Sequence, residues 1–239
     1  MKKGDARRGE LLAAAERLFY TKGYEGTSVQ DILDEMHFSK GGFYHYFDSK
    51  LAVLEAICEQ RAQECCEQAR AAILQAQGSA VDKLNAAFHA SALLSNGNPG
   101  FVALLLQVAY REDGALMREK MKTCQLTCMQ QMIEEVLAEG VAGGEFFVED
   151  VPTSAGLLLR LHMQFTDEMA FLLAREDGEE RFTEAMVKKL NAYRTAIERV
   201  LVAPFGSIVL FEAKELQLLG QSILRGRVRQ RADAMLGNG

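Results

Sequence analysis

The segment FSKGGFYHYFDSK, which runs from Phe38 to Lys50, constrains the fold more than any other part of the chain. Between Lys40 and Lys50 it holds two adjacent glycines and four aromatic residues. A glycine inside a helix costs about 1 kcal/mol relative to alanine, and aromatic side chains are normally buried. A helix of this composition needs a compensating interaction. The phosphate backbone of DNA can supply it, because the glycines leave the main chain uncovered.

Two helices are expected before this segment. Apolar residues recur at helical spacing over about residues 6–22, and Gly23 follows as a stop signal. The sequence TSVQ then matches a capping box, in which the Thr27 hydroxyl accepts from the N–H of Gln30 and the Gln30 side chain reaches back. The box predicts a second helix over about residues 28–35.

The third helix begins after Ser39, which is a good N-cap, and covers about residues 40–46. The second and third helices and the short turn between them form a helix-turn-helix, in which the later helix enters the major groove. The N-terminus of that helix offers unpaired N–H groups to a phosphate. Gly41 and Gly42 lack Cβ atoms, so DNA can approach the backbone closely.

Polar side chains of the same segment suit contacts with DNA. Lys40 can bind a guanine edge or a phosphate, and Lys50 can neutralise another phosphate. Tyr44 and Tyr46 can donate their hydroxyls to phosphate oxygens, and His45 can donate to a phosphate or a base edge. A bare three-helix packing unit is the alternative, but it leaves the glycines and lysines unexplained.

Residues 9–56 resemble the DNA-binding domain of the TetR family of bacterial transcriptional regulators. The resemblance rests on LLAAAERLFYTKGYEGTSVQDI and FSKGGFYHYFDSKLAVL, with Tyr44, Phe47 and Ser49-Lys50 in the register of the family. It implies a ligand-responsive transcriptional regulator, most often a repressor. It also implies DNA contacts at Thr27, Ser39, Lys40, Gly41, Tyr44, His45, Tyr46 and Lys50.

The chain departs from the family pattern at two places. Gly42 stands where a threonine is frequent, and Met36-His37-Phe38 stands where Ala-Gly-Val is frequent. Without a glycine, the turn needs another residue in a left-handed conformation. We expect His37 to adopt it, because histidine tolerates this region better than most residues.

Composition is compatible with this assignment but does not establish it. The formal net charge of −6 counts against a strongly basic nucleic-acid-binding protein. Residues 1–50 hold as many basic as acidic residues, so the net charge resides in residues 51–239. The 5 cysteines fit no disulfide framework, and no signal peptide or apolar run of about 20 residues occurs. These features predict a cytoplasmic protein without a membrane anchor.

The remainder of the chain has apolar residues at helical spacing. The predicted fold is all-α, with a three-helix DNA-binding domain over residues 1–50 and a larger helical domain over residues 51–239. The resemblance implies that this second domain binds a small molecule and forms a homodimer. Apolar stripes over residues 157–172 and 182–197 suit a four-helix bundle between two subunits, with packing against the chain's own core as the alternative.

Flexible apolar residues are candidates for an effector site. One predicted helix carries a stripe of polarizable sulfur-containing side chains, namely Met117, Met121, Cys124 and Cys128. Methionine is common on binding surfaces that adapt to their ligands. Further aromatic and polar contacts can come from Phe88, Tyr110, His162 and Phe165. Ordinary core packing explains these residues equally well. The apolar character of the set predicts a hydrophobic or aromatic effector.

Other functions stay open. Cys124 and Cys128 can sense oxidants or hold a metal, although no histidine or acidic residue stands at ligand spacing beside them. A protein-interaction module with a degenerate DNA-binding end is a further alternative. An enzyme, a cofactor and a resident metal are not expected, since no catalytic motif or phosphate-binding glycine loop occurs. A solvated helix surface or a second DNA contact can explain Arg225, Arg227, Arg229 and Arg231.

Overall fold

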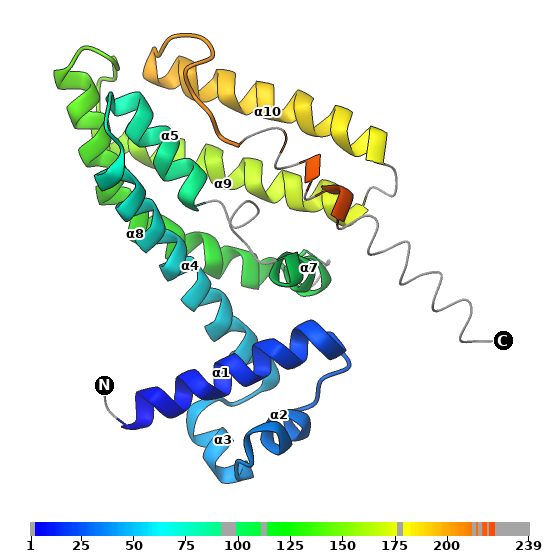
Figure 1. Cartoon of the computed structure of the whole chain (residues 1–239). Helices are drawn as coiled ribbons and strands as arrows, with labels where there is room; N and C mark the ends of the chain where they lie inside the picture. The colour runs from blue at the N-terminus through cyan, green and yellow to red at the C-terminus, as the bar shows by residue number, and fades with distance from the viewer. Residues whose placement is uncertain are drawn as a thin grey trace.

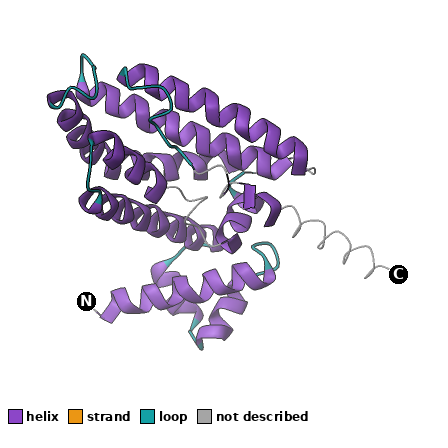
Figure 2. Ribbon diagram, turned by 45° about the horizontal axis from the view of Figure 1, so that its top comes forward, coloured by secondary structure: helices purple, strands orange, loops and turns teal. Residues whose placement is uncertain are grey.

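The computed structural model describes residues 3–91, 99–110, 114–175, 179–211, 214, 217–218 and 220–222. Helices are the only regular elements in these ranges, as Figure 2 shows, which confirms the all-α prediction. The arginines at positions 225, 227, 229 and 231 lie outside the described residues. Within them, no helix has the length and apolar character needed to cross a membrane.

The helices follow one another in two groups (Figure 1). The N-terminal group consists of α1 (Lys3–Lys22), α2 (Val29–Met36) and α3 (Lys40–Tyr46). The second group consists of α4 (Lys50–Gln75), α5 (Ala80–Ser91), α7 (Pro99–Val108), α8 (Ala115–Ala142), α9 (Val151–Arg175) and α10 (Glu179–Leu201).

Helix α4 links the two groups. It rises from the three-helix unit into the larger bundle, where it packs against α5 and α8, and α9 lies between α8 and α10 (Figure 1). The first half of α4 contributes Val53, Leu54 and Ile57 to an N-terminal apolar core, which also includes Phe101 and Leu104 of α7. Its second half joins a separate core in the bundle. The expected domain boundary at residue 50 therefore falls at the start of a helix that both cores share.

The capping box of α2 lies one residue later than predicted. The N-cap is Ser28, whose hydroxyl accepts from the N–H of Asp31 at 3.1 Å, while the Asp31 carboxylate accepts from the N–H of Ser28 at 2.8 Å. The predicted pair of Thr27 and Gln30 is wrong. Thr27 is buried, and its hydroxyl lies 2.8 Å from the carbonyl oxygen of Gly23, to which it donates. Both neighbouring residues can cap a helix, and burial of the threonine leaves the serine at the cap.

The turn between α2 and α3 closes as predicted. His37 adopts the left-handed conformation, with φ 51° and ψ 43°, and forms the C-cap of α2. Its N–H donates to the carbonyl of Asp34 at 3.3 Å, and the N–H of Phe38 donates to the carbonyl of Leu33 at 2.9 Å. These bonds satisfy the last carbonyls of α2 without a glycine.

Beyond α10 the chain reverses and returns along α5 and α9. The reversal is a turn in which the N–H of Ser207 donates to the carbonyl of Pro204 at 3.1 Å, and Gly206 has a φ of 81°. Residues 202–211, called the strap below, then bury Ile208, Leu210 and Phe211 in the core of the bundle.

Candidate nucleic-acid interface

Helix α3 is short, and it is held in place from both ends and from one face. The hydroxyl of its N-cap, Ser39, accepts from the N–H of Gly42 at 3.1 Å. Phe43 is fully buried, and the N–H of Phe47, the C-cap, donates to the Phe43 carbonyl at 3.0 Å. Both phenylalanines belong to the N-terminal core. The opposite face of the helix is thereby fixed toward solvent.

That outer face carries most of the residues predicted to contact DNA. Lys40, Gly41, Tyr44 and His45 are exposed, and Tyr46 is half-buried. In the described part of the chain, neither Lys40 nor His45 has a side-chain hydrogen bond or an ion pair. The hydroxyl of Tyr44 is likewise unpaired there, although its ring packs edge-on against Phe43 at 5.3 Å. The donors on this face are thus available to an external ligand.

The two adjacent glycines have different roles. A Cβ atom on Gly41 would meet nothing within 4 Å, so this position leaves the outer face bare. A Cβ atom on Gly42 would lie 2.7 Å from Cε1 of Phe38, which is closer than real contacts allow. The ring of Phe38 thus takes the space of a side chain at position 42. The two departures from the family pattern are therefore linked, because Phe38 of the turn packs where a side chain at position 42 would stand.

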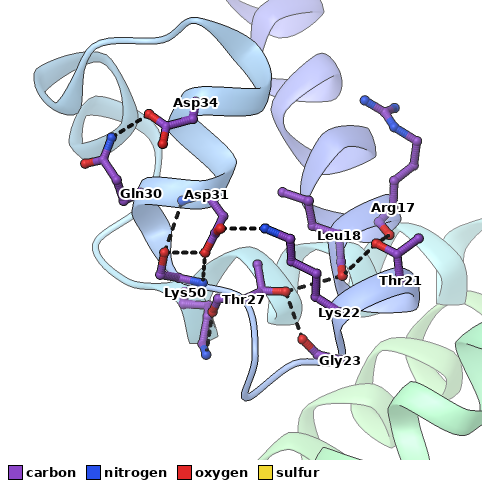
Figure 3. Close-up of polar contacts among 11 residues, drawn as sticks. Arg17, Leu18, Thr21, Lys22, Gly23, Thr27, Gln30, Asp31, Asp34 and Lys50 are labelled. Carbon is purple, nitrogen blue, oxygen red and sulfur yellow. Dashed lines mark hydrogen bonds and ion pairs between the residues drawn. The ribbon is translucent and has the colours of Figure 1, made fainter.

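Lys50 and Thr27 face inward rather than toward solvent (Figure 3). The ammonium of Lys50 donates to the carbonyls of Tyr24 at 2.7 Å and Thr27 at 2.9 Å, and it lies 4.2 Å from the centre of the Tyr24 ring. An ammonium has three N–H groups, so one remains for a phosphate. The start of α4 is clamped to the loop before α2 by these bonds. DNA contacts at both residues stay predictions.

Ion pairs between α1 and α2 use part of the acidic charge of this unit. Lys22 Nζ lies 2.6 Å from Asp31 Oδ1, and Arg17 Nη2 lies 3.4 Å from Glu35 Oε1 (Figure 3 shows the first pair). Hydrogen bonds from Lys22 and then Ser28 lower the pKa of the Asp31 carboxyl. Each pair uses one acid and one base, so the cations near α3 depend on how the unpaired charges are distributed rather than on the net charge of the segment.

Two of those cations were not among the predicted contacts. The guanidinium of Arg7 lies 5.7 Å from the centre of the Phe38 ring, and that of Arg8 lies 5.1 Å from the Phe47 ring. Both arginines are exposed, and they stand beside α3 at the N-terminal end of α1. The adjacent arginines were visible in the sequence, but nothing in the sequence showed that the start of α1 lies beside α3.

The residues predicted to bind an effector fall into two groups. Phe88, His162 and Phe165 are buried together in the core of the bundle. Met117 and Met121 instead belong to the N-terminal core, and Tyr110 packs against both cores. The structure therefore does not bring the predicted set into one site.

Met117 lines a cleft at the junction between the DNA-binding unit and the bundle. The cleft has a volume of about 250 Å³ and is lined by apolar, aromatic and acidic side chains. The cleft could not be predicted from the sequence, because its walls come from four separate segments. The lining residues are Tyr24, Glu25, Leu51, Glu55, Gln107, Val108, Gly114, Leu116 and Met117.

Two of the cysteines form a disulfide, whereas the sequence predicted no disulfide framework. Cys128 of α8 forms a disulfide with Cys66 of α4, across a Cα–Cα distance of 6.3 Å, and Cys124 is a half-buried free thiol. A redox or metal response that uses Cys124 and Cys128 together stays a prediction, and here Cys128 is bonded to Cys66 instead. Among the described residues no group of three or more His, Cys, Asp or Glu side chains could hold a metal ion.

Sequence comparisons agree with the geometry of α1 to α3. The profile of bacterial regulatory proteins of the tetR family matches residues 11–57. The chain covers less than a third of the length of the first curated relatives, one of them 48% identical over 54 residues. A longer match is to the transcriptional repressor KstR2 of Mycolicibacterium smegmatis, with 28% identity over 141 residues, which are 59% of this chain and 68% of that protein.

Solved structures share the fold over nearly the whole molecule. A TetR-family regulator from Pectobacterium atrosepticum has a TM-score of 0.62 at 21% identity, covering 84% of this chain and 97% of its own. FadR of Bacillus subtilis, solved in complex with stearoyl-CoA, has a TM-score of 0.52 at 18% identity, covering 90% and 95%. At these identities the likeness establishes the fold.

Proposed function

We propose that the chain is a transcriptional repressor of the TetR family, which its DNA-binding unit and fold resemble, and that it dissociates from its operator when a small effector binds. The exposed face of α3 is the observation that carries the proposal. Gly41 is exposed there beside Lys40 and Tyr44, whose side chains have no hydrogen bond within the described residues, and Arg7 and Arg8 flank them. Such a face can approach DNA closely and neutralise several phosphates.

Docking follows from the order of the elements. Helix α3 enters the major groove, α2 lies across the backbone, and the N–H groups after Ser39 face a phosphate. Lys40 reaches a guanine edge or a phosphate. Tyr44, His45 and Tyr46 donate to phosphates or bases, and the remaining N–H of Lys50 completes the contact. Specificity then rests on few base contacts, and affinity rests on the phosphates.

The operator is near-palindromic, because the proposed functional unit is a dimer formed through α9 and α10. The predicted stripes serve the chain's own core in part, since Phe165, Met169, Phe182 and Met186 are buried within one subunit. Leu157 of α9 and Val187 of α10 remain exposed, at 48% and 40%, and supply an apolar surface for the partner. In such a dimer the two α3 helices lie about 34 Å apart, one helical turn of DNA.

The effector is a hydrophobic or aromatic molecule that binds among the helices of the second domain. Support comes from the apolar interior around Phe88 and Phe165, and from the stearoyl-CoA held by the structurally similar FadR. The repressor KstR2, which aligns beyond the DNA-binding unit, supports repression rather than activation. The effector needs to change DNA affinity by only about 1–3 kcal/mol. We place the protein in the cytoplasm, where its operator is.

Capture of genomic DNA tests this function. The purified full chain is incubated at physiological salt with sheared DNA from the source organism, and the retained fragments are sequenced. We expect a few enriched sites that share a short inverted repeat. Uniform retention, or none after the protein has been denatured and refolded to remove bound effector, would contradict specific DNA binding.

The disulfide favours a second candidate function, regulation by oxidants. Cys66 and Cys128 join α4, which carries the DNA-binding unit, to α8. With hydrogen peroxide as oxidant, the two thiols lose two protons and two electrons, the O–O bond breaks, and one disulfide and two waters form. The test compares operator affinity of the reduced and peroxide-treated protein. A peroxide effect that Cys66→Ser abolishes and Cys65→Ser keeps supports this function, and equal affinities exclude it.

A further inference from the structure

A stack of three aromatic rings crosses the core of the bundle. The imidazole of His162 on α9 lies parallel to the Phe88 ring of α5, with centroids 4.6 Å apart and planes 10° apart. The ring of Phe211 is also nearly parallel to the imidazole, with centroids 6.3 Å apart and planes 14° apart. All three side chains are buried. Phe88 and His162 thus form a flat wall, and a planar group from the strap is stacked on it.

His162 has an unmet hydrogen-bonding group in this apolar setting. Its Nε2 atom is buried and has no hydrogen-bond partner within the described part of the chain. Burial lowers the pKa of the imidazole to about 4, so the ring is neutral near pH 7. Buried polar atoms are nearly always paired, and an unpaired one in a binding domain marks a place where a ligand can supply the partner.

Polar bonds from two side chains hold the strap that carries Phe211. The amide of Asn85 donates to the carbonyl of Ser207 at 2.8 Å and accepts from the N–H of Val209 at 2.9 Å. The carboxylate of Glu198 accepts from the N–H groups of Gly206 at 2.8 Å and Ile208 at 3.3 Å. Among the described residues, the strap has no ladder of backbone hydrogen bonds to a neighbouring element. The Phe211 ring can therefore leave the stack without breaking a backbone ladder, at the cost of side-chain hydrogen bonds and of its own apolar contacts.

We propose that the space beside Phe88 and His162 is a binding site for a planar aromatic molecule bearing a hydroxyl group, and that Phe211 fills this space until the ligand displaces it. The inference rests on the proposed function, because it names the chemical class of the effector and part of its site. An aromatic ring is required because the wall is flat and Phe211 already occupies it as a ring. A hydroxyl is required because it can both donate and accept, which suits either tautomer of the neutral imidazole.

Calorimetry with phenol and toluene tests the proposal directly. The two probes have nearly the same shape, and only phenol has a hydroxyl. In the full-length Phe211→Ala variant, we expect phenol to bind at least tenfold more tightly than it binds the wild type, because no ring has to leave. Phe205→Ala is the matched control, since Phe205 lies on the same strap and is 80% exposed. Equal phenol affinities for these two variants would overturn the proposal.

The role of His162 has its own test. In Phe211→Ala, phenol should bind at least tenfold more tightly than toluene. Adding His162→Phe keeps a planar ring on α9 but removes Nε2, and the preference for phenol should vanish while toluene still binds. If phenol and toluene bind Phe211→Ala equally, His162 does not recognise the ligand, and the assignment of the hydroxyl class is refuted.

A measurement on the wild type covers the case in which the variants do not fold. Saturating phenol should speed amide hydrogen exchange at Ile208 to Phe211, and saturating toluene should do so less. Unchanged exchange at these amides overturns the proposed displacement. None of these experiments uses DNA. A chain that binds its operator but not phenol refutes this inference alone, whereas a chain that binds phenol but no specific DNA refutes the proposed function.

Discussion

Single residues explain why this helix-turn-helix departs from its family pattern. Phe38 fills the space in which a side chain at position 42 would stand, and glycine is the residue that tolerates it. His37 takes the left-handed conformation that a glycine commonly supplies. Position 41 differs, because a Cβ atom there would meet nothing. Gly42 is thus explained by packing within the protein, and Gly41 by an open surface.

The coupling between Phe38 and Gly42 can be measured by a double-mutant cycle. Replacing glycine by alanine inside a helix normally stabilises it by about 1 kcal/mol. We expect Gly42→Ala to give this gain in a Phe38→Val background but not in the wild type, a coupling free energy of about 1 kcal/mol. Gly41→Ala is the control and should stabilise both backgrounds equally. Urea unfolding measures all the variants, and an identical effect of Gly42→Ala in both backgrounds would contradict the packing account.

His162 makes stability depend on pH in a predictable direction. Its pKa is lowered by burial to about 4 in the folded chain and is about 6.5 in the unfolded chain. The unfolded state therefore binds more protons between these values, so the free energy of unfolding falls as the pH drops from about 6.5 to about 4. The predicted loss is about 3 kcal/mol per chain. His162→Phe should remove that part of the pH dependence in urea titrations. A variant with the same pH profile as the wild type would show that the imidazole is not buried as described.

Among the helices, α4 connects the DNA-binding unit to the bundle. Its first turn is clamped through Lys50 to the loop before α2, its first half lies in the N-terminal core, and its second half lies in the bundle. A tilt of α4 in the bundle is therefore transmitted to the DNA-binding unit. The cleft beside Met117 lies at the same junction.

Removal of the clamp should lower both stability and DNA affinity. Lys50→Met keeps the apolar stem but loses the ammonium that donates to two carbonyls. We expect a loss of about 2 kcal/mol in the free energy of unfolding, since hydrogen bonds to a charged group contribute about 1.5–3 kcal/mol each and water can replace part of them. Affinity should fall by the same factor for operator and unrelated DNA. Unchanged unfolding in urea would argue against the clamp, and a selective loss for the operator would argue against a phosphate contact.

Most helices could be predicted from the sequence, because caps and apolar spacing are local signals. The start of α3 after Ser39 follows from one residue type at one position. The predicted cap of α2 was wrong by one residue. Thr27 and Ser28 can both cap a helix, and they differ in that Thr27 is buried. Burial depends on how α1 packs on α2, which no local pattern contains.

In the whole molecule, the helices that form the proposed DNA-binding face were more predictable than the positions of the proposed effector residues. The residues of α3 are contiguous, so one short pattern carries most of the interface. The predicted effector residues come from three helices and the turn after α7. An apolar stripe looks the same in the sequence whether it faces a ligand or the core. The disulfide between Cys66 and Cys128 joins residues 62 positions apart, so it could be found only when α4 and α8 were placed side by side.

The salt dependence of operator affinity tests whether the outer face of α3 binds DNA. Affinity for the recovered genomic site is measured over a series of salt concentrations for the wild type, Lys40→Ala and Lys83→Ala. Lys83 lies in α5 and pairs with Glu139 at 2.5 Å, so its variant has the same change of net charge far from α3. Lys40→Ala should weaken binding and reduce the slope of log affinity against log salt by about 1, while Lys83→Ala keeps the wild-type slope. Identical slopes for all three proteins would show that Lys40 on the outer face of α3 does not bind a phosphate.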